Sequence, residues 1–134
     1  MTLHLATGAL AGARVRSRWA ALAVGPPLHL LGDVLPHGEI DSRAFEAGSG
    51  LAALSALAVT YGPLHPITLG AASAAAPDLE HVLRLPRPRG RPLFPSHRWR
   101  RLHHAGGLPG WAQFLCASIA IGALIRRAGG RTAG

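Results

Sequence analysis

Residues 47–77 read AGSGLAALSALAVTYGPLHPITLGAASAAAP and contain no Asp, Glu, Lys or Arg. The stretch is too long for one ordinary helix of about 11–12 residues, and Gly62, Pro63 and Pro66 break its apolar pattern near the middle. Proline has a fixed φ and no N–H to donate, so helices tend to end or begin at such positions. We therefore predict two helices, over roughly residues 46–61 and 66–83, joined by a tight turn around His65.

A second charge-free run, LPGWAQFLCASIAIGALI, occupies residues 108–125 and is closed by Arg126 and Arg127. A helix of about 18 residues measures about 27 Å, close to the roughly 30 Å hydrocarbon thickness of a bilayer. Trp111 suits a membrane interface, and the two arginines can extend their charged ends to the headgroups. A buried central helix in a soluble bundle is the alternative, but the run favours a membrane helix.

Two further helices are expected upstream. Residues 3–13 are weakly amphipathic, and residues 19–35 are apolar apart from His29 and Asp33. The sequence Gly25-Pro26-Pro27 is expected to interrupt the second of these helices. Ala and Gly along the segments permit the close helix contacts of membrane bundles. The predicted fold is therefore all-α, a compact bundle of about five helices, several of them membrane-embedded.

The whole chain has 134 residues, a formal charge of +8, 49% hydrophobic residues and one Cys. This length predicts a single helical membrane domain over residues 1–128, which includes a basic, Pro-rich loop at 84–104, followed by a disordered tail at 129–134. The hydrophobic content excludes an intrinsically disordered chain, and one Cys excludes a disulfide framework. Because the first basic residue is Arg14, we expect no signal peptide.

Short connections make successive helices alternate in direction, and this alternation gathers the polar residues at one end of the bundle. All six acidic residues and seven of the eight histidines then fall at the same end, and His65 falls at the other. Polar groups near membrane depth are costly, so we interpret this end as a functional site. Both ends carry several Arg, and the charge pattern leaves the orientation in the membrane open.

The polar end contains the run HLLGDVLPHGEID from His29 to Asp41. His29 and Asp33 are one helical turn apart, so an imidazole and a carboxylate can hold the same cation. After Pro36, His37 and Asp41 can fold back toward that cation, or they can be ordinary polar residues at a helix end. Imidazole combined with carboxylate suits zinc, manganese or iron.

A second polar group, Asp78-Leu79-Glu80-His81, closes the first charge-free stretch. Asp78 and His81 can share a helical face, and an ionised carboxylate at the end of an apolar helix needs a metal or an Arg as its partner. The alternative is that Asp78 caps a new helix after Pro77. We favour the metal-binding interpretation.

The basic loop ends in SHRWRRLHH, residues 96–104, which contains His97 and His103. These histidines can bind a metal, but His among Arg is also ordinary in a basic surface loop. In the same loop PRGRP, residues 88–92, is similar to the core of an AT-hook, which places Arg-Gly-Arg in an AT-rich minor groove. Cys116 lies in an apolar run and is interpreted as a packing residue.

Together these motifs resemble those of small bacterial proteins described as membrane-bound metal-dependent hydrolases. The family pattern has an early His, a Pro-Asp-x-Asp-His element, a His-Arg-Gly-x-Thr-His-Ser element and a His-x-x-x-Asp pair on a helix. His4 is similar to the early His, residues 77–81 to the second element with Glu80 for its later Asp, and His29 with Asp33 to the pair. His97-Arg98 matches only the start of the third element. The resemblance implies a multi-pass protein of the bacterial inner membrane with metal-dependent hydrolase activity.

We therefore expect a divalent metal ion, zinc, manganese or iron, on one membrane face. The first candidate ligands are His29, Asp33, Asp78 and His81, and the outer candidates are His4, His37, His97 and His103. In an enzyme, metal-activated water would attack a phosphoester or lipid-like substrate. The expected general base is Glu80 or Asp41, and the expected phosphate-binding residue is Arg98 or Arg100.

Two other functions stay open at this point. One is a non-catalytic membrane protein that binds anionic lipid headgroups or a protein partner through the Arg-rich loop. The other, less favoured, is a basic DNA-binding protein that uses the AT-hook-like PRGRP. Nucleic acid is thus the least favoured partner, and the sequence is compatible with a homo-oligomer.

Overall fold

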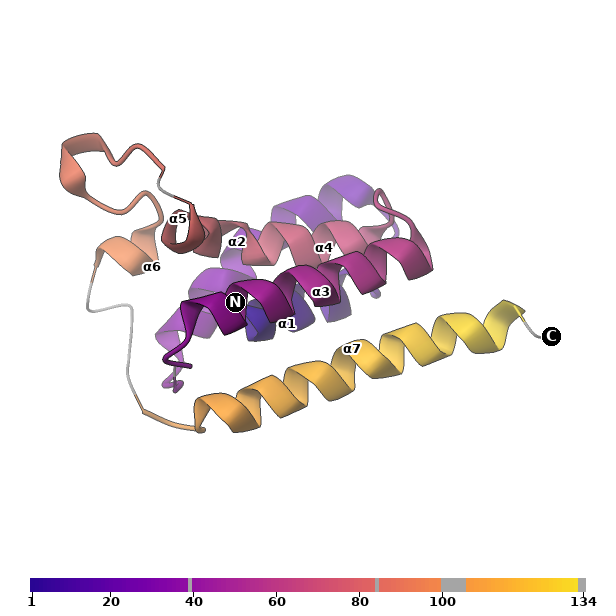
Figure 1. Cartoon of the computed structure of the whole chain (residues 1–134). Coiled ribbons are helices and arrows are strands. Elements are labelled where there is room, and N and C mark those ends of the chain that lie inside the picture. Colours follow the sequence, from indigo (N-terminus) through magenta and orange to yellow (C-terminus); the bar gives the residue numbers. More distant parts are fainter. Residues whose placement is uncertain (39, 84, 100–105, 133–134) are drawn as a thin grey trace.

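The structure, a computed structural model, describes residues 1–38, 40–83, 85–99 and 106–132, which form helices and connecting loops. The helices of ten or more residues are α1 (Thr2–Gly12), α2 (Arg18–Val34), α3 (Arg43–Tyr61), α4 (Pro66–Ala75) and α7 (Gly110–Thr132). Between α4 and α7 lie the short elements η1 (Ala76–Asp78), α5 (Leu79–Val82), η2 (Pro88–Gly90) and α6 (Pro95–Arg98). In Figure 1 the long helices lie side by side, and the short elements gather at one end. The predicted all-α, compact bundle of about five helices is confirmed.

Helix α4 lies at the centre, because it packs against both α1 and α2. Its contact with α1 depends on glycine: a Cβ built on Gly8 would lie 2.1 Å from the carbonyl oxygen of Gly70. The backbones of the two helices therefore touch directly, as the Gly and Ala content predicted. Most other buried apolar residues are Ala, and the larger side chains of the core are Leu5, Leu57, Ile67, Ile121 and Leu124.

Local signals explain where the long helices begin and end. Ser17 and Ser42 begin α2 and α3, and His65 begins α4; each side chain accepts a hydrogen bond from a backbone N–H of the first turn. Helix α3 ends at Gly62, whose φ of +96° is a conformation that favours glycine. His65 thus serves as a cap at the end of α4 away from the other histidines, as the alternating topology predicted.

Two predicted helix boundaries are wrong. Helix α2 continues through Pro26 and Pro27, where an interruption was expected. Helix α2 packs closely against α4 at this point, where the hydroxyl of Ser73 donates to the carbonyl of Ala21 at 3.2 Å and a Cβ on Gly25 would lie 2.0 Å from Ser73 Oγ. The helix predicted over residues 66–83 ends at Ala75 instead, because Pro77 interrupts the α-helical hydrogen bonds and the chain passes through η1 into α5.

Helix α7 contains most of the apolar run of residues 108–125 and continues to Thr132. Most of the tail predicted to be disordered at 129–134 is therefore helical, and residues 133–134 lie outside the described part of the chain. Among the described residues, none of the helices combines the length and the apolar character needed to cross a bilayer. The membrane-embedded helices of the sequence analysis stay a prediction.

Candidate metal centre

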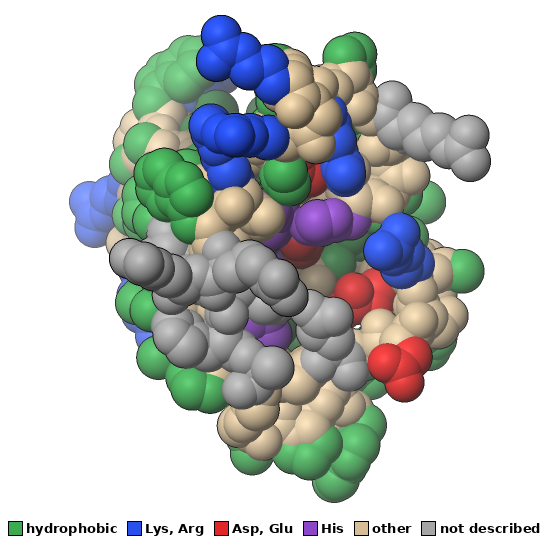
Figure 2. Space-filling view, turned by 90° about the vertical axis from the view of Figure 1, so that its left-hand side faces the viewer, with side chains coloured by type: hydrophobic (Ala, Val, Ile, Leu, Met, Phe, Trp, Pro, Cys, Tyr) green, Lys and Arg blue, Asp and Glu red, His purple; other side chains and the backbone are tan. Residues whose placement is uncertain are grey.

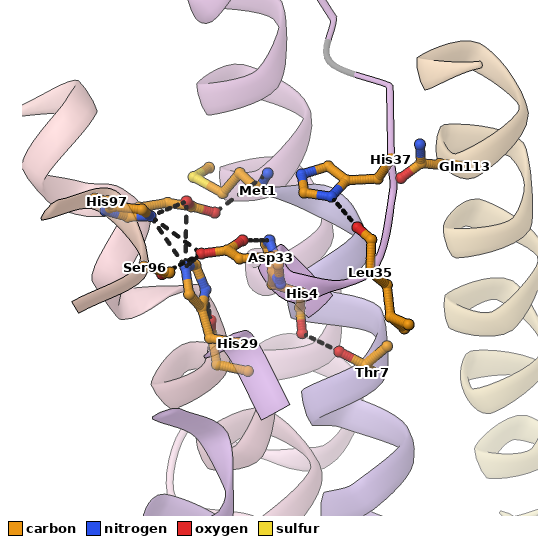
Figure 3. Close-up of polar contacts among 12 residues, drawn as sticks. Met1, His4, Thr7, His29, Asp33, Leu35, His37, Ser96, His97 and Gln113 are labelled. Carbon is orange, nitrogen blue, oxygen red and sulfur yellow. Dashed lines mark hydrogen bonds and ion pairs between the residues drawn. The ribbon is translucent and has the colours of Figure 1, made fainter. Parts of the chain in front are cut away.

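Seven polar side chains meet at the end of the bundle where α1 begins and α2 ends. Figure 3 shows His4, His29, Asp33 and His97 pointing toward one another from three different helices. His4, His29 and Asp33 lie near the ends of otherwise apolar helices that meet when the helices alternate, and the basic loop after α5 brings His97 to the same end. The seven residues are His4, His29, Asp33, Asp78, Glu80, His81 and His97.

Four side-chain atoms form the centre of this cluster. His29 Nε2 lies 3.2 Å from both His97 Nε2 and Asp33 Oδ2. Asp78 Oδ1 lies 3.7 Å from His29 Nε2 and 3.8 Å from His97 Nε2, and Asp33 Oδ2 lies 3.5 Å from His97 Nε2. Ligands about 2.0–2.1 Å from a tetrahedral zinc ion are roughly 3.3–3.4 Å apart. The five separations bracket that spacing, so each of the two carboxylate oxygens lies at ligand spacing from both imidazole Nε2 atoms.

Both imidazoles are oriented by a hydrogen bond from the opposite ring nitrogen. His29 Nδ1 donates to the carbonyl of Ala74 at 2.7 Å, an acceptor available because Ala74 lies in the last turn of α4. His97 Nδ1 donates to Glu80 Oε1. Because a carbonyl and a carboxylate only accept, each Nδ1 carries a proton, and each Nε2 faces the centre, where the neutral imidazole offers a lone pair to an ion. Metal-binding histidines use this arrangement.

The Asp33 carboxylate is held from both sides. His4 Nε2 lies 3.1 Å from Asp33 Oδ1, and the hydroxyl of Ser96 donates to Asp33 Oδ2. His4 reaches this position across Gly32, because a Cβ on Gly32 would lie 2.7 Å from His4 Cε1. Three hydrogen-bonding neighbours, His4, His29 and Ser96, therefore favour the ionised form of a nearly fully buried carboxylate.

Asp78 brings a second carboxylate to the cluster, and a buried, ionised carboxylate needs a positively charged neighbour. Its Oδ2 atom is buried and makes no hydrogen bond to any described residue. The amino group of Met1 lies 3.2 Å from this atom and 3.3 Å from Glu46 Oε1. The Met1 ammonium therefore supplies Oδ2 with a positive partner, while Oδ1 faces His29 and His97.

Glu80 is occupied by three hydrogen bonds. Its Oε1 accepts from His97 Nδ1 and, at 3.4 Å, from the N–H of Phe94, while Oε2 accepts from the N–H of Leu93 at 2.6 Å. Burial raises the pKa of Glu80, but these hydrogen bonds and the charge of His97 outweigh burial and place the pKa below its ordinary value. Glu80 is therefore ionised and orients His97, whereas the sequence analysis assigned it the role of general base.

His81 lies at the exposed edge of the cluster, and its ring centroid is 4.2 Å from that of His97. Desolvation by the surrounding protein atoms, and then the charge of His97, lower the pKa of His81 below its ordinary value. Its imidazole is therefore neutral at neutral pH and can accept a proton. This property suits a general base better than the fully engaged carboxylate of Glu80.

A cavity of about 460 Å³ opens beside the four central atoms. It is large enough for a small-molecule group, since ligand sites span roughly 300–1,000 Å³. Some of the charged and histidine side chains on its wall belong to the central cluster. The others come from the segment before α3 and from the first turn of α3, and they are His37, Asp41, Arg43 and Glu46. Figure 2 shows His and acidic side chains reaching the surface on this face of the molecule.

The structure brings most predicted site residues together but changes their order of importance. His29, Asp33 and Asp78 lie at the centre as predicted. His97 joins them there, although the sequence placed it among the outer candidates, and His81 moves to the edge.

The remaining predicted residues lie around this centre or outside the described part of the chain. His4 contacts Asp33, and the ring centroid of His37 lies 6.4 Å from that of His4. Asp41 lines the cavity, and Arg98 is exposed on α6. His103 and Arg100 lie outside the described residues.

Sequence reasoning missed two groups that hold the centre. Ser96 directly precedes His97, and this adjacency to a candidate ligand was its only available signal. The carbonyl of Ala74 carries no side-chain signal at all, and only the three-dimensional arrangement shows that it accepts from His29.

Comparisons of the chain with protein-family models, with curated proteins and with solved structures gave no match. The class of the molecule is therefore given by its own geometry: an all-helical bundle with a His/Asp cluster at one end. The family resemblance of the sequence motifs stays a prediction.

Proposed function

We propose that this protein is a metal-dependent hydrolase with one divalent ion bound by His29, Asp33, Asp78 and His97. The observation that supports it is the spacing of the two Nε2 atoms from each other and from both carboxylate oxygens, 3.2–3.8 Å, together with the two Nδ1 hydrogen bonds that turn both Nε2 atoms inward. Two imidazole nitrogens and two carboxylate oxygens at this spacing favour zinc over manganese or iron.

Each surrounding residue has a separate role in the proposed hydrolysis of a phosphoester. A bound divalent ion supplies water of lowered pKa and positive charge for the substrate. Glu80 fixes His97, while His4 and Ser96 fix Asp33. At the edge of the cluster, the neutral imidazole of His81 accepts the proton of the attacking water. Arg43, which lines the cavity, binds a phosphate oxygen, the role that the sequence assigned to Arg98 or Arg100.

Metal content of the purified full chain tests the binding site. We expect close to one equivalent of zinc by elemental analysis in the wild type and a loss of most of it in Asp33→Ala and His97→Ala. His65→Ala is the matched control, because it removes a histidine at the opposite end of α4 and should keep the metal. Folded wild-type protein that takes up no zinc, manganese or iron would refute the proposal.

Hydrolysis of a chromogenic phosphodiester tests the catalytic role. His81→Gln should retain zinc and lose about 100–10,000-fold in kcat, the range that a general base contributes. Equal activity of His81→Gln and wild type would remove His81 from the mechanism. A metal-loaded wild type without hydrolytic activity would reduce the proposal to metal binding.

We also propose that the bundle is embedded in a membrane, because several of its large apolar side chains lie on the surface. Trp19, Leu51, Val59, Trp111 and Ile119 are each at least 60% exposed, whereas most of the buried apolar residues are Ala. Soluble monomers rarely expose extended apolar patches of this kind. Retention in the membrane fraction after washing with alkaline carbonate, followed by release with detergent, is expected; release by carbonate alone would contradict it.

A further inference from the structure

The segment from Leu85 to Trp99, here called the Arg loop, is the most strongly basic described surface next to the metal centre. It carries no Asp or Glu. Its arginines Arg87, Arg89, Arg91 and Arg98 are all exposed. Figure 2 shows Arg side chains gathered beside the His and acidic side chains that reach the surface. The proposed hydrolase mechanism uses none of these four arginines.

Large apolar side chains flank these arginines in the sequence. Leu93 is 52% exposed and Trp99 is 55% exposed, and Leu85 is exposed as well. Arginine attracts anionic headgroups, while Leu and Trp enter the boundary between headgroups and acyl chains. DNA would leave the leucines and the tryptophan without a role. The combination therefore fits a bilayer surface better than a nucleic acid.

The Arg loop is also held in a defined shape. At its tip Arg89 has a φ of +56° and Gly90 a φ of +70°, which makes a tight turn that projects Arg89 outward. At its base Arg87 Nη2 donates to the carbonyl of Glu80 at 3.0 Å, and the N–H of Leu93 donates to the Glu80 carboxylate. The residue that orients His97 thus also closes the loop.

We propose that the Arg loop docks on the headgroups of an anionic phospholipid bilayer and holds them beside the metal centre. The three observations that carry this proposal are the acid-free cluster of exposed arginines, the flanking exposed apolar side chains and the attachment of the loop to Glu80. That the bound headgroup provides the phosphoester rests on the proposed function; the docking itself does not.

Fluorescence of Trp99 reports the docking directly. The full chain carrying Trp19→Phe and Trp111→Phe keeps Trp99 as its one tryptophan. This protein is reconstituted into phosphatidylcholine liposomes, or added to them if it purifies without detergent. The liposomes contain a small, equal fraction of either brominated phosphatidylglycerol or brominated phosphatidylcholine. We expect Trp99 to be quenched several-fold more strongly by the brominated phosphatidylglycerol.

Charge-removal variants identify the arginines responsible. Each Arg near an anionic surface contributes roughly a five-fold preference, so Arg87→Ser, Arg89→Gly and Arg91→Ser together should bring the quenching ratio close to one. Arg89→Gly removes the charge at a φ that glycine adopts freely. The matched control removes three arginines between α1 and α2: Arg14→Ser, Arg16→Ser and Arg18→Ser.

The docking proposal is overturned if brominated phosphatidylglycerol and phosphatidylcholine quench Trp99 equally in the parent protein, or if both triple variants lower the ratio alike. It is also overturned if free glycerol phosphate abolishes the preference, because the ligand is then a soluble phosphate. Zinc content is measured on every sample. In the parent protein, no lipid preference with full zinc content refutes the docking alone, whereas a clear preference without zinc refutes the metal centre alone.

Discussion

Replacing Glu80 with Gln changes the charge and hydrogen bonding of one carboxylate that never contacts the proposed ion. Glu80 now accepts from three donors, His97 Nδ1 and the N–H groups of Leu93 and Phe94. A glutamine amide has one acceptor oxygen, and its NH2 group donates. At least one of the three donors must therefore face another donor, and the charge that favours the Nδ1–H form of His97 is removed.

The expected magnitude follows from this geometry. Partners that orient a metal-binding histidine typically contribute 10–100-fold in metal affinity, which corresponds to about 1.4–2.7 kcal/mol. Glu80→Gln should therefore raise the zinc Kd by that factor, measured by competition with a chromogenic chelator. Helical content by circular dichroism should stay unchanged, because Glu80 lies in the short helix α5, outside the long helices.

Glu46→Gln provides the matched control. Glu46 also lines the cavity, but its recorded contact is with the amino group of Met1, and its side chain is 33% exposed. The same change of charge there should alter the zinc Kd by less than about two-fold, since a partly exposed pair contributes little. An unchanged Kd in folded Glu80→Gln, or an equal loss in Glu46→Gln, would refute the assignment of Glu80 as the orienting group.

Two glycine replacements test the packing that delivers the site. Gly8→Ala should destabilise the bundle by about 1–3 kcal/mol in denaturant or thermal unfolding, because its Cβ would meet the Gly70 carbonyl. Gly122→Ala is the control: it has open space around it and should be neutral or stabilising by up to about 1 kcal/mol. Gly32→Ala should displace the His4 ring and weaken zinc binding with little change in unfolding. Retained zinc affinity in Gly32→Ala would show that His4 does not support the centre.

The gathering of polar residues at one end could be predicted, because it depends only on the order of the helices. His29 and Asp33 follow a long apolar segment, and Asp78 follows another, so alternation brings these ends together whatever the details of packing. The same argument placed His65 at the far end. The two errors in the long helices, at Pro26 and at Pro77, both involve proline: α2 continues through Pro26 and Pro27, whereas α4 ends two residues before Pro77.

The roles of the individual site residues could not be predicted. His81 was favoured as a ligand because it shares a helical face with Asp78, but its ring lies at the exposed edge of the cluster beside His97. His97 was placed further out because positive neighbours disfavour cation binding. The buried carboxylate of Glu80 offsets them, and this contact joins residues 17 positions apart.

The missing N–H of Pro77 influences which ring nitrogen of His29 carries a proton. A proline has no N–H, and here α4 stops at Ala75. If the α-helix continued through Asp78, the N–H of Asp78 would take the carbonyl of Ala74 as its i−4 acceptor. The break leaves that carbonyl to His29, where it decides which nitrogen of the imidazole carries hydrogen. Pro77 offers no atom to a metal ion, yet through this break it selects the tautomer of His29, a proposed ligand.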